Sequence, residues 1–211
     1  MNKPPQENPD RRSVPAHSPD APRLILASGS PRRAELLREY GYNFEVIHPP
    51  FDEPPAPIRH ANPVEWAETV SFLKAESVAA LVKNGWILSG DTVAAIDDRI
   101  FGKPADRADA EAILRSLAGT THRVITGVTL LDAATGRRLI RHDITHVTMR
   151  SLCDREIADY LDTNAWQGKA GAYGIQDRGD AFVERIDGSF TNVVGFPMEL
   201  IREMLEDWTG S

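Results

Sequence analysis

The sequence of 211 residues lacks long apolar runs and contains a single cysteine. A bilayer-spanning helix needs about 18 or more consecutive apolar residues, so the sequence predicts neither a membrane span nor a membrane partner. One cysteine, Cys153, cannot form a disulfide within the chain. This fits a reducing compartment, and we predict a cytoplasmic location. No signature of a reactive cysteine surrounds Cys153, so we expect a half-buried packing thiol.

Basic residues are in the minority as well. Lysine and arginine together number 24 against 31 aspartates and glutamates, which gives a formal net charge of −7 at pH 7. Proteins that bind nucleic acids usually present a basic face, so this balance argues against a nucleic-acid partner. It is still compatible with a small anionic ligand held by a local basic cluster.

Familiar catalytic signatures are missing too. The chain has no G-x-x-x-x-G-K-[ST] phosphate loop, no glycine-rich dinucleotide fingerprint after a strand, no H-E-x-x-H zinc motif and no G-x-S-x-G nucleophile elbow. The six histidines lack the spacing of metal ligands. A catalytic site in this chain must therefore be built from other residues.

The N-terminal segment differs in composition from the rest. Residues 1–22, MNKPPQENPDRRSVPAHSPDAP, are rich in proline, asparagine, aspartate and serine, and they contain no apolar core of a secretory signal. Such a segment cannot bury enough apolar surface to fold, so we expect a disordered tail. One domain is then predicted over residues 23–211.

The remaining chain alternates between strand and helix patterns, which predicts an α/β fold with a mixed β-sheet. Strands are expected in RLILA, NFEVIH, GWILSG (ending at Asp91), VAAIDDRIF (as a hairpin), HRVITGVTLLD, RRLIRHDITHVTM and AFVERI, and helices over residues 31–40, 63–83, 106–117, 154–163 and 197–208.

The stretch LILASGSPRRAELL places two arginines where they oppose their own helix. Pro31 suits the first helical position and Ser30 the N-cap. Arg32 and Arg33 then fall in the first turn, where the helix dipole disfavours cations. A bound phosphate would offset that cost, because it accepts bonds from backbone N–H groups, arginines and the hydroxyls of Ser28 and Ser30 together. The stretch predicts a phosphate site, with a solvated basic helix end as the alternative.

Three further stretches hold candidate residues. Asp91 and Thr92 follow an apolar strand, where open α/β sheets place ligands. An aspartate there could hold Mg²⁺ or orient a water, or could simply form a turn. Lys103 in FGKP is a point charge that could face phosphate or solvent. In GKAGAYGIQD, Tyr173 offers a stacking face and Gln176 a two-way amide suited to the edge of a base; an ordinary flexible loop is the alternative.

The stretches ASGSPRR, SGDTV, GKP followed by LAGTTHRVITGV, and KAGAYGIQ occur in the order found in the Maf nucleoside triphosphate pyrophosphatases. The chain resembles this family over residues 23–207. The resemblance implies a central twisted mixed sheet with flanking helices and a deep cleft between two lobes. It implies hydrolysis of a nucleoside triphosphate to the monophosphate and pyrophosphate, with a divalent cation, Mg²⁺ or Mn²⁺, as cofactor. It also implies that a homodimer can form.

The resemblance assigns roles to individual positions. Asp91 matches the residue that acts as proton acceptor or metal ligand, and Lys74, in LKAES, matches a basic residue of the second helix. Glu53, in FDE, matches the acidic metal ligand, although Asp52 could take its place. The expected catalytic residues are Asp91, Lys103, Arg32 and Arg33, the expected substrate contacts are Ser28, Ser30, Lys74, Thr92 and Gln176, and the expected metal ligands are Asp91 and Glu53.

The AYGIQ motif resembles the subfamily that acts on dTTP, UTP and related modified pyrimidine nucleotides. The chain departs from the common pattern at Gly90, where alanine is usual, and at Asp177, where glycine is usual. We expect Gly90 to loosen the strand end, and Asp177 to add a negative charge beside the base pocket, which leaves the exact nucleotide open. Two alternatives therefore stay open: a pyrophosphatase for 7-methyl-GTP or other purine nucleotides, and a nucleotide-binding regulator of septum formation.

Overall fold

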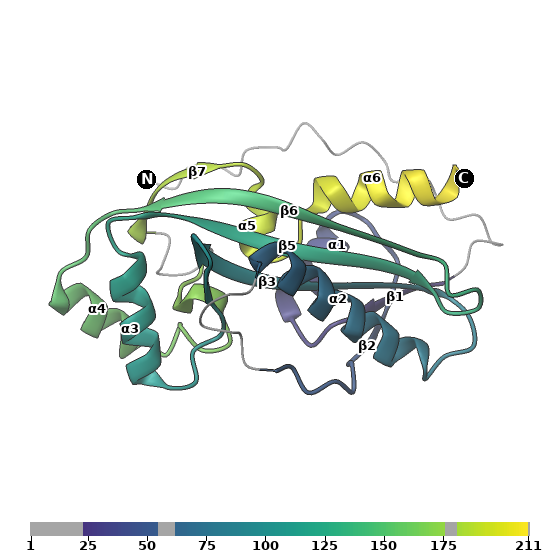
Figure 1. Ribbon diagram of the computed structural model, residues 1–211, viewed down its shortest axis with the longest axis horizontal. Helices are drawn as coiled ribbons and strands as arrows, with labels where there is room; N and C mark the ends of the chain where they lie inside the picture. The colour runs from purple at the N-terminus through teal and green to yellow at the C-terminus, as the bar shows by residue number, and fades with distance from the viewer. Residues whose placement is uncertain (1–22, 55–61, 176–180, 211) are drawn as a thin grey trace.

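The computed structural model describes residues 23–54, 62–175 and 181–210 (Figure 1). The predicted tail, residues 1–22, lies outside the described residues. No helix in the described part of the chain is both long and apolar enough to cross a membrane.

Within these residues, a mixed sheet of seven strands forms the centre of the molecule, which confirms the predicted α/β class (Figure 1). Six strands run in the order β2-β1-β3-β5-β6-β7, and β4 pairs with β3 beside this path. β1 is parallel to β2 and β3, and the other pairs are antiparallel. The strands are β1 (Leu24–Ala27), β2 (Glu45–Ile47), β3 (Trp86–Ile96), β4 (Arg99–Phe101), β5 (Thr121–Asp132), β6 (Arg138–Met149) and β7 (Val183–Asp187).

Helices cover both faces of the sheet because its buried side chains alternate. Along β1, Leu24 and Leu26 pack with the apolar sides of α1 and α6, whereas Ile25 and Ala27 pack with α2 on the opposite face. The helical segments are α1 (Pro31–Glu39), α2 (Pro63–Ala79), α3 (Arg107–Leu117), α4 (Asp154–Leu161), the 3₁₀ turn η1 (Ala170–Ala172), α5 (Phe190–Val194) and α6 (Met198–Thr209).

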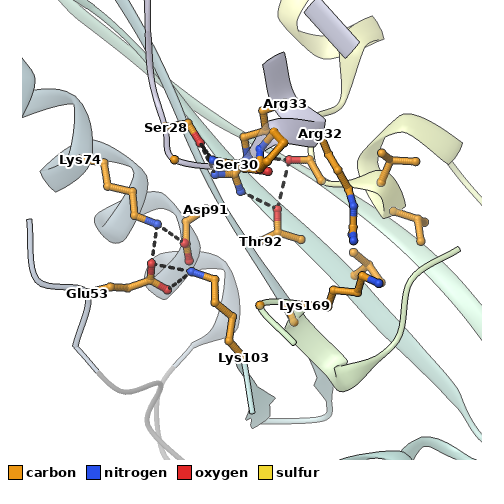
Figure 2. A pocket seen from close by; sticks show the side chains of 18 of the residues that line it. Ser28, Ser30, Arg32, Arg33, Glu53, Lys74, Asp91, Thr92, Lys103 and Lys169 are labelled. Atoms are coloured by element: carbon orange, nitrogen blue, oxygen red, sulfur yellow. Dashed lines mark hydrogen bonds and ion pairs between the residues drawn. The ribbon is translucent and has the colours of Figure 1, made fainter. Parts of the chain in front are cut away.

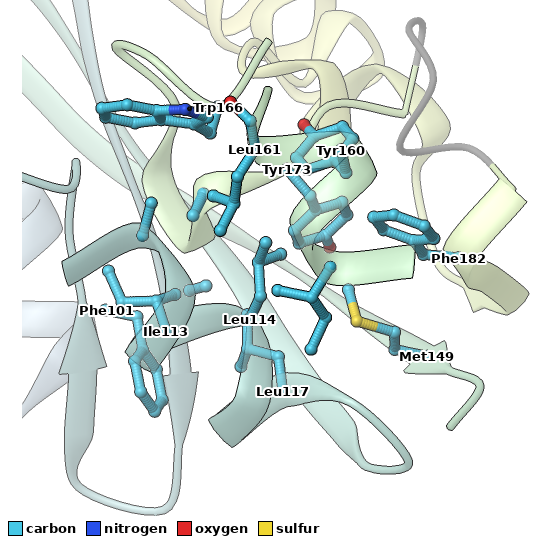
Figure 3. Packing of buried hydrophobic residues seen from close by; sticks show 14 of the residues in the cluster. Phe101, Ile113, Leu114, Leu117, Met149, Tyr160, Leu161, Trp166, Tyr173 and Phe182 are labelled. Carbon is cyan, nitrogen blue, oxygen red and sulfur yellow. Dashed lines mark hydrogen bonds between the residues drawn. The ribbon is translucent and has the colours of Figure 1, made fainter. Parts of the chain in front are cut away.

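A second apolar cluster lies at one end of the sheet, where α3, α4 and η1 pack together (Figure 3). Leu114 and Leu117 of α3 meet Leu161 of α4 there, with Trp166 and Tyr173 beside them. This cluster is separate from the one that α1 and α6 cover.

Helix α2 approaches the sheet closely at Gly127 of β5. A Cβ atom at this position would lie 2.4 Å from the backbone carbonyl of Ala67 in α2, a separation that no side chain can occupy. The lack of a side chain at Gly127 therefore lets α2 lie close to the sheet. The same spacing determines how near Lys74, two turns further along α2, comes to the sheet.

Several local predictions are wrong. GWILSG and VAAI form one strand, β3, because it pairs with β1 through Ser89 and with β5 from Trp86 to Ala95. Gly90 consequently lies inside a strand and loosens no end; it packs against the Phe196 ring, which a Cβ would approach to 3.0 Å. Helix α2 ends at Ala79 rather than near Lys83, because the next backbone bonds tighten to i→i+3 spacing.

Two further differences concern the C-terminal half. Cys153 is exposed rather than half-buried, because it sits at the N-cap of α4, outside the face that this helix buries. Helix α5 was not predicted, since five residues are too few for a helical period to show in the sequence.

Candidate active site

The turn between β1 and α1 leaves the start of the helix open. Ser30 is the N-cap residue as predicted, but its side chain makes no capping hydrogen bond. Instead the Ser30 N–H donates to the buried hydroxyl of Ser28 at 3.1 Å. The first turn contains no acidic residue. Backbone N–H groups at this end are therefore not masked by a capping side chain or an acid, as a phosphate site requires.

Arg33 is fixed by three hydrogen bonds to uncharged oxygen atoms. Its Nε donates to the Gly195 carbonyl at 2.9 Å, and its terminal nitrogens donate to Thr92 Oγ1 at 3.1 Å and Ser28 Oγ at 3.3 Å. Burial lowers the pKa of Arg33, and the charges of Asp91 and Glu53 oppose that shift. An arginine stays protonated in proteins, so this half-buried side chain brings a full positive charge to the cavity.

Asp91 lies within β3 and not at its end, contrary to the prediction. It still follows the last residue of β3 that pairs with β1, Ser89, and so stands at the carboxyl edge of the parallel pair. Asp91 is 3% exposed, and its carboxylate accepts a bond of 2.6 Å from the ammonium of Lys74, a residue that is itself 7% exposed. The expected ligand position in an open α/β sheet is thus occupied by a buried ion pair.

Glu53 joins the same network. Its carboxylate lies 2.9 Å from the ammonium of Lys74 and 2.9 Å from that of Lys103. Burial acts to raise the pKa of Glu53, but the charges and hydrogen bonds of Lys74 and Lys103 outweigh it and bring the pKa to about 2. Glu53, not Asp52, lines the cavity described next, which favours Glu53 between the two candidate acids.

One cavity of about 820 Å³ brings the predicted residues together (Figure 2). Figure 2 shows Lys74, Asp91, Glu53 and Lys103 as one group, Arg33 between Ser28 and Thr92, and Arg32 directed toward Lys169. The predicted site residues that line the cavity are Ser28, Ser30, Arg32, Arg33, Glu53, Lys74, Asp91, Thr92 and Lys103. Gln176 and Asp177 lie outside the described residues.

Sequence reasoning missed Lys169 and Gly195. Lys169 lines the cavity, is 8% exposed, and donates from its ammonium to the Ala165 carbonyl. Its position in KAGAYGIQ, a stretch already singled out, is a signal that could have found it. Gly195 contributes a carbonyl to Arg33 from 162 positions away, and nothing local in the sequence announces that contact.

Tyr173 differs from its prediction as a stacking face. The side chain lines the cavity but is 5% exposed and belongs to the core cluster of α3 and α4. Its hydroxyl shares a hydrogen bond of 2.8 Å with Nε2 of His122. The Tyr173 ring is thus part of the cavity wall, and His122 holds its hydroxyl on the side away from the cavity.

Comparison with known proteins gives consistent matches. The chain matches the family model described as Maf-like protein over residues 23–208. It is 40% identical over 184 residues to the dTTP/UTP pyrophosphatase of Pelotomaculum thermopropionicum, covering 87% of this chain and 95% of that protein. The proteins of the same name from Carboxydothermus hydrogenoformans and Alkaliphilus metalliredigens are 42% and 43% identical, covering 88% and 87% of this chain and 98% and 94% of theirs. Every predicted site residue falls within the matched segment.

Proposed function

The chain belongs to the Maf family, and from that premise we propose that it is a nucleoside triphosphate pyrophosphatase. It hydrolyses the bond between the α and β phosphates of dTTP, UTP and modified pyrimidine nucleotides. The observation that carries this proposal is a single cavity in which an open, arginine-bearing helix start faces a buried carboxylate paired with lysine. Relatives named dTTP/UTP pyrophosphatase, at 40% identity and above, support the choice of substrate.

The cations of the cavity suit a triphosphate. In the proposed complex, Arg33 and the first-turn N–H groups hold one phosphate next to the hydroxyls of Ser28 and Ser30. Arg32 and Lys169, which lie to the right of Arg33 in Figure 2, extend the positive surface along the polyphosphate. The negative charge of the bound triphosphate is then offset at several points.

The carboxylates of the cavity suit a divalent cation. Asp91 and Glu53 both contact one ammonium, Lys74, so their oxygens already converge on a position that selects positive charge. Within the described residues no group of three or more His, Cys, Asp or Glu side chains could hold a metal. Mg²⁺ commonly takes one or two carboxylates and completes its shell with water and substrate phosphates, so this pair fits Mg²⁺ or Mn²⁺ bound together with nucleotide. Such an ion would neutralise phosphate charge and lower the pKa of a bound water.

Asp91 is the proposed proton acceptor. A water oxygen attacks the α-phosphorus, the bond from that phosphorus to the bridging oxygen breaks, and pyrophosphate leaves with the bond electrons. The water proton passes to the Asp91 carboxylate. Lys74 holds that carboxylate in place through their 2.6 Å contact, Lys103 stabilises the leaving group, and the two arginines bind the phosphates both before and after the bond breaks. We assign Gln176 to the recognition of the base. The predicted homodimer and cytoplasmic location stay predictions.

A panel of nucleotides tests the proposal. Full-length protein with Mg²⁺ or Mn²⁺ is mixed with dTTP, UTP, 7-methyl-GTP, ATP or GTP, or with dTDP as a control, and pyrophosphate and phosphate are quantified separately. We expect pyrophosphate and the monophosphate from dTTP and UTP, and no pyrophosphate from dTDP. Preferential turnover of 7-methyl-GTP or other purine nucleotides would show instead that the chain is a pyrophosphatase for those nucleotides. Tight nucleotide binding with no pyrophosphate release would favour the regulator of septum formation and contradict catalysis.

A further inference from the structure

A buried polar pair lies directly behind the cavity wall. His122 of β5 is 1% exposed and does not line the cavity, whereas Tyr173, at 5% exposure, does. Nε2 of His122 lies 2.8 Å from the Tyr173 hydroxyl, and the two rings meet edge to face with centroids 5.5 Å apart. Within the described residues, Nδ1 of His122 has no hydrogen-bond partner. The imidazole therefore directs its polar contact to one side chain of the cavity wall.

The backbone just before Tyr173 is strained. Gly171 and Ala172 have φ values of 72° and 60°, and a left-handed conformation is unfavourable for alanine. Such a conformation persists only when its surroundings over-determine it, and strain of this kind gathers at functional sites. The Gly171 N–H donates to the carbonyl of Gly102 at 3.1 Å, which ties the turn to the residue before Lys103. The bond between Tyr173 and His122 is a second tie on its other side.

The segment that these two hydrogen bonds hold continues along the cavity wall. After Tyr173 the chain reaches Ile175, which lines the cavity at 9% exposure and precedes Gln176. If this hydrogen bond broke, Nε2 of His122 and the Tyr173 hydroxyl would both be buried without a partner. We therefore expect the bond and the strained turn to be lost together. Burial lowers the pKa of His122 to about 4, which keeps the ring neutral and able to pair at physiological pH.

We infer that His122 is a positioning residue for substrate selection, acting through the Tyr173 hydroxyl to hold residues 171–175 on the wall that receives the base. This inference rests on the proposed function, because it concerns how that same cavity chooses its nucleotide. It is a role in recognition and not in chemistry, since His122 itself does not reach the cavity.

Four variants test the inference. Tyr173→Phe removes the hydroxyl and keeps the ring, His122→Leu removes the imidazole, and His122→Gln keeps a polar amide near the position of Nε2. Tyr160→Phe is the matched control, because Tyr160 is a buried tyrosine of the same cluster that does not line the cavity (Figure 3). Two readouts are taken: kcat and KM for dTTP, UTP, ATP and GTP, and amide hydrogen exchange at Gly171 and Ala172, which needs no substrate.

Tyr173→Phe and His122→Leu should raise KM for dTTP and UTP about tenfold, leave kcat within about twofold, and narrow the preference over purine nucleotides. Exchange at Gly171 and Ala172 should accelerate in both variants and return toward the wild-type rate in His122→Gln. Tyr160→Phe should change neither readout. Wild-type KM, nucleotide preference and exchange in Tyr173→Phe would overturn the inference. So would a loss of activity that is equal for every nucleotide and proportional to the fraction of unfolded protein. If wild-type protein releases no pyrophosphate, the proposed function fails, and unchanged exchange in Tyr173→Phe still refutes the positioning role on its own.

Discussion

Two cationic regions of the cavity balance their charge in opposite ways. Arg33 makes its three hydrogen bonds to neutral oxygens of Gly195, Thr92 and Ser28. Lys74 and Lys103 instead lie within 2.9 Å of the carboxylates of Asp91 and Glu53. Among the residues that the structure describes, no carboxylate contacts Arg33, so the first region, around Arg33, keeps its positive charge. The second region pairs two cations, Lys74 and Lys103, with two anions, Asp91 and Glu53.

This difference separates binding from chemistry. A fixed, uncancelled guanidinium attracts a phosphate without rearrangement, because its hydrogen-bond partners are already in place. In the paired region, a substrate or metal ion must displace a lysine from a carboxylate before it gains a contact. We expect substitutions in the first region to act mainly on substrate capture, and those in the second to act mainly on turnover.

The largest effect should come from Asp91→Asn in the paired region. An amide cannot accept the water proton, so kcat should fall by about 10²- to 10⁴-fold. The fold should survive, because Lys74 keeps its contact with Glu53. Pyrophosphate release and circular dichroism give the two readouts, with Asp98→Asn, an exposed site in the β3–β4 turn, as control. Near-wild-type turnover in Asp91→Asn would remove Asp91 from the proposed chemistry.

Arg33→Lys is the corresponding change in the first region. A lysine keeps the charge but cannot reach three separate oxygen atoms as a planar guanidinium does. We expect kcat/KM to fall by about 10²-fold, mostly through KM. Arg38→Lys, on the exposed end of the same helix, should leave kcat/KM unchanged. If Arg33→Lys lowered kcat alone, the division between capture and turnover would not hold.

The two regions also differ in how far sequence could reach. The turn from Ser28 to Arg33 is contiguous, so helix-start rules alone indicated a phosphate site. The paired region joins four separate segments, and only the family resemblance brought Glu53, Lys74, Asp91 and Lys103 together.

The sequence failed where long-range pairing decides local structure. Small and polar residues around Gly90 read as a strand end, yet ladders to β1 and β5 carry β3 straight through them. The Gly195 carbonyl and the bond between His122 and Tyr173 depend on contacts 162 and 51 positions apart, which no local pattern encodes.

Gly127→Ala tests the spacing between α2 and the sheet, which positions Lys74 of the paired region and not Arg33. The added Cβ would collide with the backbone of Ala67, and overpacking of this kind costs about 1–3 kcal/mol of unfolding free energy. Helix α2 must move away from the sheet, which lengthens the contact between Lys74 and Asp91 and lowers kcat. Denaturant unfolding and pyrophosphate release measure both effects. Gly136→Ala, whose Cβ meets nothing within 4 Å, adds left-handed strain without a collision and should lower stability less and leave kcat unchanged.

The smallest effect concerns acid. The lysines hold the pKa of Glu53 at about 2 in the folded protein, against an ordinary value of 4.5, so unfolded chains bind the proton more readily. Glu53 therefore contributes stability that is fully present above pH 4.5 and is lost as the pH falls toward 2. Because solvent screens this partly exposed group, we expect about 1 kcal/mol. Unfolding free energies of wild type and Glu53→Gln should differ by that amount at pH 6 and converge only as the pH falls toward 2. The hydrogen-bond partners of Arg33 do not titrate, so the gap between wild type and Arg33→Lys should change less over the same range; equal pH dependence in both pairs would erase the distinction between the two regions.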